Sequence, residues 1–350
     1  MKLKNIHLST SEKLGLVSNM STMLTAGIPI LETIDSLLED AKGNQKKLLE
    51  SVRSDLTEGN HVSTSFEKFP EIFDKVTINL LKAAEEAGTL DVTLKDLKDN
   101  IKKETEFKDK IKAALTYPML IVIVFIGVLF MILVVVIPKI STVFSRLNVK
   151  LPLPTVILIT MSDIVVKQTV PFVIGTIIFV VSVVFLFKKQ KKTVLHYVFS
   201  LPLVSKLIKE IDLTRFSRSM YLLLNAGIPI TLALELGREV VMKDDISRAL
   251  KNSTEVVLSG KKLSEGLKEA KSIIPGIMIK IIEAGEKSGS LDKSMQDISE
   301  YLDYEVSNTL RTLTAMLEPI MLIFVGILVG GMMLAIIAPI YGLIGQVGAK

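Results

Sequence analysis

The sequence predicts an all-α membrane protein with two homologous cytoplasmic helical-bundle domains, of about six helices each, and three transmembrane helices. Three observations predict this class. Long uncharged apolar runs occur in a chain of 350 residues of which 23% are charged. The two halves of the chain repeat each other, and no segment shows the alternation of a strand over a useful length.

The predicted first cytoplasmic domain covers residues 1–112 and is helical. Ser9 and Glu12 have the spacing of a capping box that opens a helix. Gly27 is placed to end that helix in a left-handed conformation, and Pro29 suits the start of the next one. The segment Ala-Gly-Ile-Pro is therefore expected to be a structural turn between two helices. Gly88 ends a later helix that carries Glu85.

Three apolar runs reach the roughly 20 residues that a helix needs to cross a bilayer. They are Met119–Ile137, Val170–Phe187 and Ile320–Ala338. Buried core helices are the alternative, but soluble helices rarely exclude every charge over such a length. The predicted order after the first domain is a transmembrane helix at 113–138, an extracytoplasmic loop at 139–169, a transmembrane helix at 170–187, the second cytoplasmic domain at 188–314, a transmembrane helix at 315–339 and an extracytoplasmic tail at 340–350.

The basic residues beside these runs predict the orientation. Lysines gather before the first run and after the second, and the loop between them has fewer. Because basic residues are retained in the cytoplasm, the N-terminus and both helical domains are expected there, and the C-terminus outside.

An internal repeat relates the two cytoplasmic domains. The pentapeptide Ala-Gly-Ile-Pro-Ile at 26–30 recurs unchanged at 226–230, so Gly227 and Pro229 correspond to Gly27 and Pro29. Residues 80–91 resemble residues 281–292, which pairs Glu85 and Gly88 with Glu286 and Gly289. The correspondence continues to the membrane, where Tyr117 and Pro118 match Glu318 and Pro319. The chain is therefore one unit used twice, with an extra span between the copies.

Residues for catalysis, metal binding or cofactor binding are not recognisable in the sequence. The chain has no cysteine, and its three histidines lie far apart. No phosphate-binding loop or nucleophile motif is present. A net charge of +5 is too small to indicate a nucleic acid partner.

Two other classes of membrane protein fit the sequence less well. A transporter or channel built on the repeat would be expected to carry ionisable residues within its spans, and they are missing. A membrane-bound enzyme would use the helices of Glu85 and Glu286, but these carboxylates, like Glu86 and Glu283, are more easily interpreted as polar faces of helices. The spacing of Gly326 and Gly330 favours contact between membrane helices.

Over about residues 9–345 the chain resembles the secretion F family, the inner-membrane platform proteins of type IV pilus, type II secretion and competence machines. The motifs that carry the resemblance are Phe216-Ser217-Arg218, Leu222 to Pro229, Glu283 to Leu291, Leu317-Glu318-Pro319, Ala26 to Pro29, Ala114 to Pro118, Leu151 to Thr155 and Ser162-Asp163. The first copy departs from the family pattern, because Ala84 stands where the second copy has Gly285, and Ser18 corresponds to Arg218.

The resemblance implies a multi-pass protein of the bacterial cytoplasmic membrane that forms a homo-oligomer among membrane lipid. Its implied partners are a cytoplasmic hexameric assembly or retraction ATPase, pilins or pseudopilins, and other inner-membrane assembly proteins. It implies no direct contact with nucleic acid, no cofactor and no catalysis. The expected structural or partner-contact positions are Gly27, Pro29, Glu85, Gly88, Pro118, Gly227, Pro229, Glu286, Gly289, Glu318 and Pro319.

Overall fold

The computed structural model describes residues 6–146, 153–167 and 202–347. Within these residues every regular element is a helix and no strand occurs, as the all-α prediction requires. The predicted span at 170–187 lies outside the described residues. The chain forms two compact units: a helical unit of residues 1–110 and 206–308, and an apolar unit of residues 111–205 and 309–350.

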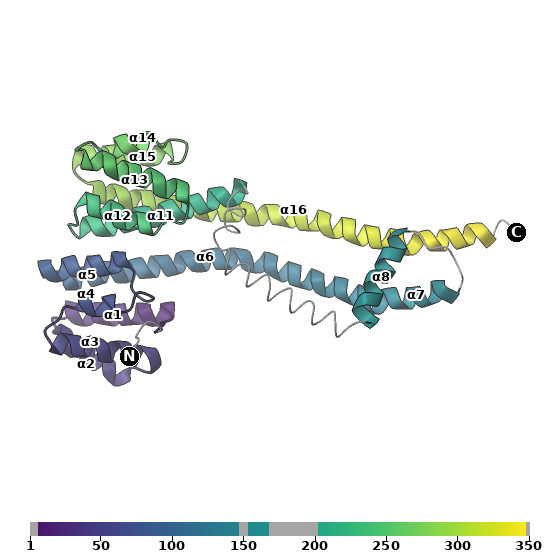
Figure 1. Cartoon of the computed structure of the whole chain (residues 1–350), viewed down its shortest axis with the longest axis horizontal. Coiled ribbons are helices and arrows are strands. Elements are labelled where there is room, and N and C mark those ends of the chain that lie inside the picture. The colour runs from purple at the N-terminus through teal and green to yellow at the C-terminus, as the bar shows by residue number, and fades with distance from the viewer. Residues whose placement is uncertain (1–5, 147–152, 168–201, 348–350) are drawn as a thin grey trace. The chain divides into compact units, whose positions relative to one another are not determined.

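Each copy in the helical unit consists of five helices and the first part of a long sixth one (Figure 1). In the first copy these are α1 (Thr10–Thr25), α2 (Ile30–Asp40), α3 (Gly43–Thr57), α4 (Val62–Glu67), α5 (Lys75–Ala87) and α6 (Leu90–Met131). In the second copy they are α11 (Pro202–Asn225), α12 (Ile230–Glu239), α13 (Asp244–Leu258), α14 (Leu263–Lys268), α15 (Gly276–Ser288) and α16 (Leu291–Val347).

The local signals for helix ends act as predicted. Ser9 and Glu12 form the capping box of α1, in which the Glu12 carboxylate accepts from the Ser9 amide at 2.7 Å. Gly27 has a φ of 82° and Gly227 a φ of 76°. The following amides, of Ile28 and Ile228, each donate to a helix carbonyl five residues back, at 3.0 Å in both copies. This hydrogen bond closes a Schellman motif, which glycine adopts without strain.

Pro29 and Pro229 are the N-caps of α2 and α12, one residue before the first helical turn. The two Ala-Gly-Ile-Pro segments are therefore the predicted helix–turn–helix corners.

The cores of the two copies differ in membership. One cluster is built from first-copy side chains alone, such as Leu16, Leu48 and Phe66. The second cluster centres on Phe216 and Leu250 but also includes Val76 and Leu80 of α5. The first copy therefore contributes part of the second copy's core.

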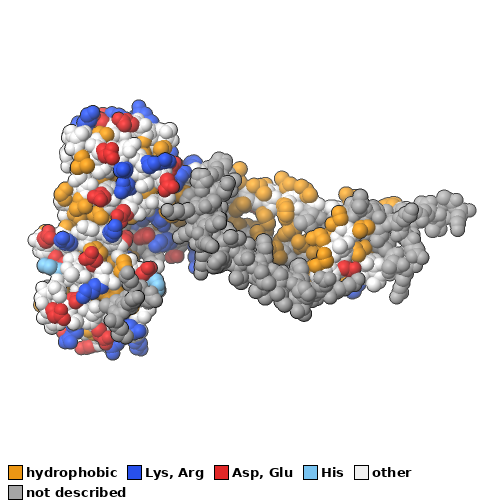
Figure 2. Space-filling model, in the orientation of Figure 1, with side chains coloured by type: hydrophobic (Ala, Val, Ile, Leu, Met, Phe, Trp, Pro, Cys, Tyr) orange, Lys and Arg blue, Asp and Glu red, His pale blue; other side chains and the backbone are white. Residues whose placement is uncertain are grey.

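The long helices α6 and α16 continue from the helical unit into the apolar unit without a break. Among the residues the structure describes, two segments are long and apolar enough to cross a membrane: Leu90–Val143, which begins with α6 and continues past its end, and Leu291–Gly331 within α16. Their side chains at 119–131 and 320–334 include many exposed large hydrophobic residues. Figure 2 shows hydrophobic side chains over this region and charged ones over the bundles.

Helices also occupy the described part of the predicted loop at 139–169. After a short π-helix, η2 (Ile132–Val136), the chain continues as α7 (Ile137–Arg146) and then forms α8 (Leu153–Lys167). Helix α8 packs against η2 and α7. The described part of this predicted loop is thus helical and packs against the end of the first apolar segment.

Candidate functional site

The Glu85 carboxylate does not lie on a solvent-exposed face of α5. Its side chain is only 10% exposed and accepts the backbone amides of Val62 at 2.6 Å and Ser63 at 3.0 Å. The Ser63 hydroxyl donates to it as well. These are the first amides of α4, which have no partner inside that helix. Glu85 therefore caps α4 from a different helix.

Glu286 makes the same contact in the second copy. Its carboxylate accepts the Leu263 amide at 2.6 Å and the Ser264 amide at 3.3 Å, which are the first amides of α14. A carboxylate near a helix N-terminus is also favoured by the helix dipole. The polar-face interpretation is therefore wrong for Glu85 and Glu286, because their carboxylates turn inward toward a neighbouring helix.

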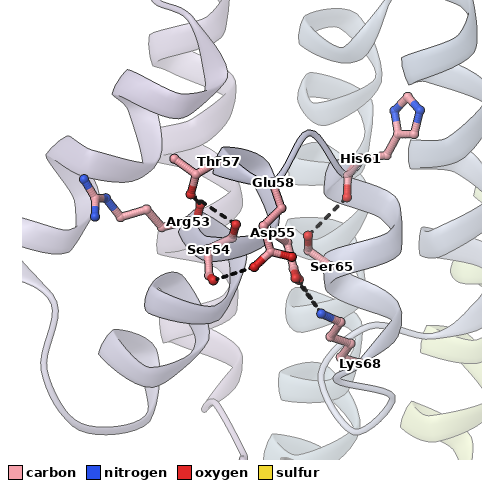
Figure 3. A network of polar contacts seen from close by, with 8 residues as sticks. All are labelled: Arg53, Ser54, Asp55, Thr57, Glu58, His61, Ser65 and Lys68. Atoms are coloured by element: carbon pink, nitrogen blue, oxygen red, sulfur yellow. Dashed lines mark hydrogen bonds and ion pairs between the residues drawn. The ribbon is translucent and has the colours of Figure 1, made fainter.

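The short helix α4 is held in place by a second set of polar contacts (Figure 3). Lys68, just after α4, donates to both carboxylate oxygens of Asp55 in α3, at 2.6 and 2.7 Å. The Ser65 hydroxyl donates to the carbonyl of His61, the N-cap of α4, at 3.1 Å. The short helix α4 is thus fixed at both ends.

Gly88 and Gly289 end α5 and α15 in left-handed conformations, with φ of 69° and 71°. Each lies three residues after its capping glutamate, so the motif Glu-x-x-Gly joins a cap for one helix to the end of another. At Gly285 the small size of glycine matters, not its backbone conformation. A Cβ atom there would lie 2.2 Å from the Ser294 hydroxyl of α16.

Charged side chains join the two copies within the helical unit. Lys75 of α5 donates to Glu239 of α12 at 2.7 Å. Lys103 and Lys110 of α6 donate to Glu300 and Asp303 of α16, both at 3.2 Å. Asn225, the last residue of α11, donates to Asp96 of α6 at 2.9 Å. The first copy supplies the lysines and the second copy their carboxylate partners.

Arg218 lies in the middle of this joint. Its side chain is 11% exposed, with its guanidinium 3.9 Å from the Asp303 carboxylate and 5.8 Å from the ring centre of Phe107 in α6. Burial lowers the pKa of Arg218, and the nearby acids Asp303 and Glu104 act in the opposite direction. Cavities of about 360, 290 and 340 Å³ surround Arg218 between the first copy and the second; α6 lines all three, and α5 also lines the third. Their lining contains nearly equal numbers of acids and bases, so the joint does not select an anion or a cation.

Prolines free two carbonyl groups in the apolar unit. Pro118 lies inside α6 and has no amide hydrogen for the carbonyl of Ala114, four residues back. The Thr314 hydroxyl of α16 lies 3.4 Å from that carbonyl oxygen, although its shorter bond, of 2.9 Å, is to Leu310.

In η2 the Ile137 amide bonds to Ile132, five residues back. The next bond of this pattern would need the missing amide hydrogen of Pro138. The buried Ser162 hydroxyl of α8 donates to the freed carbonyl of Leu133 at 2.6 Å instead. Hydroxyl groups relieve proline breaks in membrane helices in this way.

The residues predicted from the sequence fall into separate places. Gly27 and Pro29 form one corner and Gly227 and Pro229 the other, while Glu85 with Gly88 and Glu286 with Gly289 form the two capping sites. Pro118, Glu318 and Pro319 lie within the long helices, where Glu318 and Pro319 are exposed. Within the described ranges, no three histidines, aspartates or glutamates gather to hold a metal ion.

Sequence reasoning missed several residues that the structure singles out. Asp212 of α11 is fully buried and accepts the amides of Met242 and Lys243 at 3.0 and 2.8 Å, before α13. Burial raises the pKa of Asp212, and these hydrogen bonds oppose that shift. Ser162 and Arg218 were noted only as parts of motifs, and nothing in their spacing pointed to their contacts.

A duplicated helical unit, each copy of which runs into one apolar helix, defines a class of repeat-built membrane-associated protein. Residues 16–138 and 216–339 match the family described as "Type II secretion system (T2SS), protein F", one match for each copy. The chain belongs to this family.

Curated relatives match nearly the whole chain. A type IV pilus assembly protein PilC of Pseudomonas aeruginosa is 28% identical over 94% of this chain and 89% of its own length. PilC of Thermus thermophilus is 27% identical, covering 95% and 82% of the two chains. A type II secretion system protein F of Aeromonas hydrophila is 26% identical, covering 95% and 86%.

Proposed function

We propose that the chain is the cytoplasmic-membrane platform of a type IV pilus machine, or of a related competence or type II secretion machine. In this role it couples a cytoplasmic motor ATPase to the assembly of pilin or pseudopilin subunits. One observation carries the proposal: the family match covers both helical copies and, in each, extends to the proline at the end of the apolar run. The relatives named for pilus assembly and for secretion support the same role.

The long helices suggest how such a platform transmits force. Helix α6 has 42 residues and α16 has 57, and each runs from a capped bundle into an apolar segment. A continuous helix of α6's length extends about 60 Å at 1.5 Å per residue. We propose that, because one helix continues from the bundle into the apolar segment, a displacement of the bundle is passed to that segment. We propose that both bundles lie in the cytoplasm, where a motor can reach them, and that the C-terminus lies outside.

The capping residues serve this role indirectly. Glu85 and Glu286, with Gly88 and Gly289, fix α4 and α14 against the helices that precede α6 and α16. We propose that they keep each bundle rigid enough to transmit a load, and that the motor binds elsewhere on the helical unit.

A deletion strain tests the function directly. We expect loss of surface filaments, DNA uptake or secretion, and co-purification of the intact chain with the motor ATPase. Normal filaments, uptake and secretion in the deletion strain would reject the proposal. Substrate flux in liposomes containing the chain would instead favour a transporter. A reporter fused after Lys150 tests the orientation, which is wrong if the reporter is cytoplasmic.

A second experiment tests coupling through the helix. Three residues, Gly-Gly-Ser, inserted after Lys112 interrupt α6 between bundle and apolar segment. The matched control carries the same insertion after Gly260, in the turn between α13 and α14. We expect the first variant to bind the motor but to make no filaments, whereas the control retains both properties. Filament assembly by the first variant contradicts rigid coupling.

A further inference from the structure

The contact between the two copies uses one face of α5. Val76, Leu80 and Ala83 lie at the spacing of a single helical face and pack against the second copy's core, and α5 contacts α12. Lys75 extends this face with its bond to Glu239. We call Val76, Leu80 and Ala83 the α5 stripe.

The second copy has the corresponding stripe on α15. Within the described part of the chain, the first copy does not pack against this stripe. The corresponding residues are Ile277, Ile281 and Ala284, here called the α15 stripe. Ile277 is 45% exposed, Ile281 is half-buried and Ala284 is exposed. Ile281 packs against the core of its own copy, so the exposed part of the stripe is Ile277 and Ala284. Apolar side chains that are exposed where the other copy covers their counterparts indicate a place where a partner is missing.

The surface that receives the α5 stripe also has a counterpart. Ser219, Leu222 and Val240 of the second copy line one cavity together with Val76 and Leu80. The corresponding residues of the first copy are Asn19, Thr22 and Asp40. They line an open groove of about 330 Å³ with Met23, Ser36, Leu37, Ala41 and Gln45. We call it the α1–α2 groove.

Opposite charges favour contact between the α15 stripe and the α1–α2 groove. Helix α2 carries four acids, Glu32, Asp35, Glu39 and Asp40, and no base. Lys280 is exposed beside the α15 stripe, and Lys287 is exposed there as well, in an ion pair with Glu283. The groove is more polar than its counterpart, since Ser36 and Asp40 replace Leu236 and Val240. A contact there is weaker than the internal one and suits association between separately folded chains.

We propose that the α15 stripe of one chain docks into the α1–α2 groove of a second copy of this chain, repeating between chains the contact that α5 makes within one. The contact joins two different surfaces, so each chain keeps a free stripe or groove for the next. Such contacts build closed rings or open arrays rather than simple two-fold dimers. Neither the family nor the relatives' names identify these surfaces, so the inference goes beyond the proposed function.

Cross-linking of the full chain tests the contact, because the chain contains no cysteine. Ile277→Cys and Asp40→Cys chains with different affinity tags are co-expressed, purified in detergent and treated with a short bis-maleimide. We expect a product of twice the chain mass that carries both tags. Chains that carry Ile277→Cys alone, or Asp40→Cys alone, should give no such product.

Two controls fix the interpretation. A single chain with Val76→Cys and Val240→Cys, two positions that line one cavity, should cross-link without a change in mass, which shows that the bundle is folded. Leu258→Cys, exposed at the end of α13, should give no product with Asp40→Cys. Three results would overturn the proposal. The first is a cross-linked product from Ile277→Cys chains alone, and the second is the absence of the mixed product although the chains still sediment as oligomers. The third is that the chains remain monomeric.

Charge reversal provides a test that a merely structural effect would not reproduce. Lys280→Glu should lower the yield of the mixed product about tenfold, because it places like charges across the contact. Glu39→Lys in the other chain should restore it. A yield unaffected by Lys280→Glu, or not restored by Glu39→Lys, contradicts docking in the α1–α2 groove.

Discussion

Replacing Glu286 separates a capping role from a partner-binding role. The carboxylate accepts the first two amides of α14, a helix of six residues in which those amides have no helical partner. Loss of a cap costs about 1 kcal/mol, and hydrogen bonds to a charged group contribute about 1.5–3 kcal/mol. We therefore expect Glu286→Ala to destabilise the start of α14 by about 2–3 kcal/mol, and Glu286→Gln, which keeps an acceptor oxygen, by about 1 kcal/mol.

Amide hydrogen exchange in the full chain measures this cost at the residues concerned. Because 1.4 kcal/mol is a factor of ten, protection at Leu263 and Ser264 should fall about 30-fold or more in Glu286→Ala. The first copy offers a matched pair. Glu85→Ala should expose Val62 and Ser63, whereas Glu86→Ala, at the exposed neighbouring acid, should not. Unchanged protection in Glu286→Ala would refute the capping role. If motor binding were also lost, Glu286 would be a partner contact.

Four further predictions concern packing, backbone conformation, charge and the apolar unit. Gly285→Ala places a Cβ 2.2 Å from the Ser294 hydroxyl and should cost about 1–3 kcal/mol in denaturation experiments, whereas Gly15→Ala, in open space within α1, should stabilise the chain by up to about 1 kcal/mol. Gly227→Val, at a φ of 76°, should destabilise the second copy by about 1 kcal/mol or more; an unchanged thermal melt of the full chain would contradict this. Hydrogen bonds from Lys287 and Lys268 lower the pKa of Glu283 to about 2, so its contribution to stability is complete above pH 4.5 and is lost only as the pH falls through about 2; an NMR titration midpoint near 4.5 would show that the lysines do not hold it. Ser162→Ala leaves the buried Leu133 carbonyl unpaired and should weaken α8 packing by about 1–3 kcal/mol, seen as faster exchange in α8 but not in α1.

The turns and helix ends could be predicted because their causes lie within a few residues. A positive φ at Gly27 follows from a helix that must stop before Pro29, and the Ser9 capping box needs only its own first turn. The internal repeat then transferred each local prediction to the second copy, where Gly227 and Gly289 have the expected backbone. The apolar runs in α6 and α16 were recognisable by length and composition alone.

The capping contacts could not be predicted because their partners lie far apart in the chain. Glu85 and Val62 are 23 residues apart, as are Glu286 and Leu263. Periodicity places a glutamate on a helix but does not show which helix N-terminus it meets. Gly285 is similar: its small size matters only because Ser294 of α16 lies against it. The one signal available was the recurrence of Glu-x-x-Gly in both copies, which marked the positions without revealing their contacts.

Residues at the joint differ between the two copies because the copies pack against different neighbours there, although both have the same helical fold. Glycines and prolines of the corners and the capping glutamates are identical in both copies, and each makes the same contact twice. Several of the differences lie at the joint: Arg218, which faces Asp303 and Phe107, corresponds to Ser18, and the apolar Leu236 and Val240 correspond to Ser36 and Asp40. The Ala84 departure therefore does not weaken the first capping site, because Glu85 still binds both amides. The turns and caps are the same in each copy because each bundle must fold. The joint residues differ because, within the described part of one chain, the α5 stripe packs against this face of the second copy and not of the first.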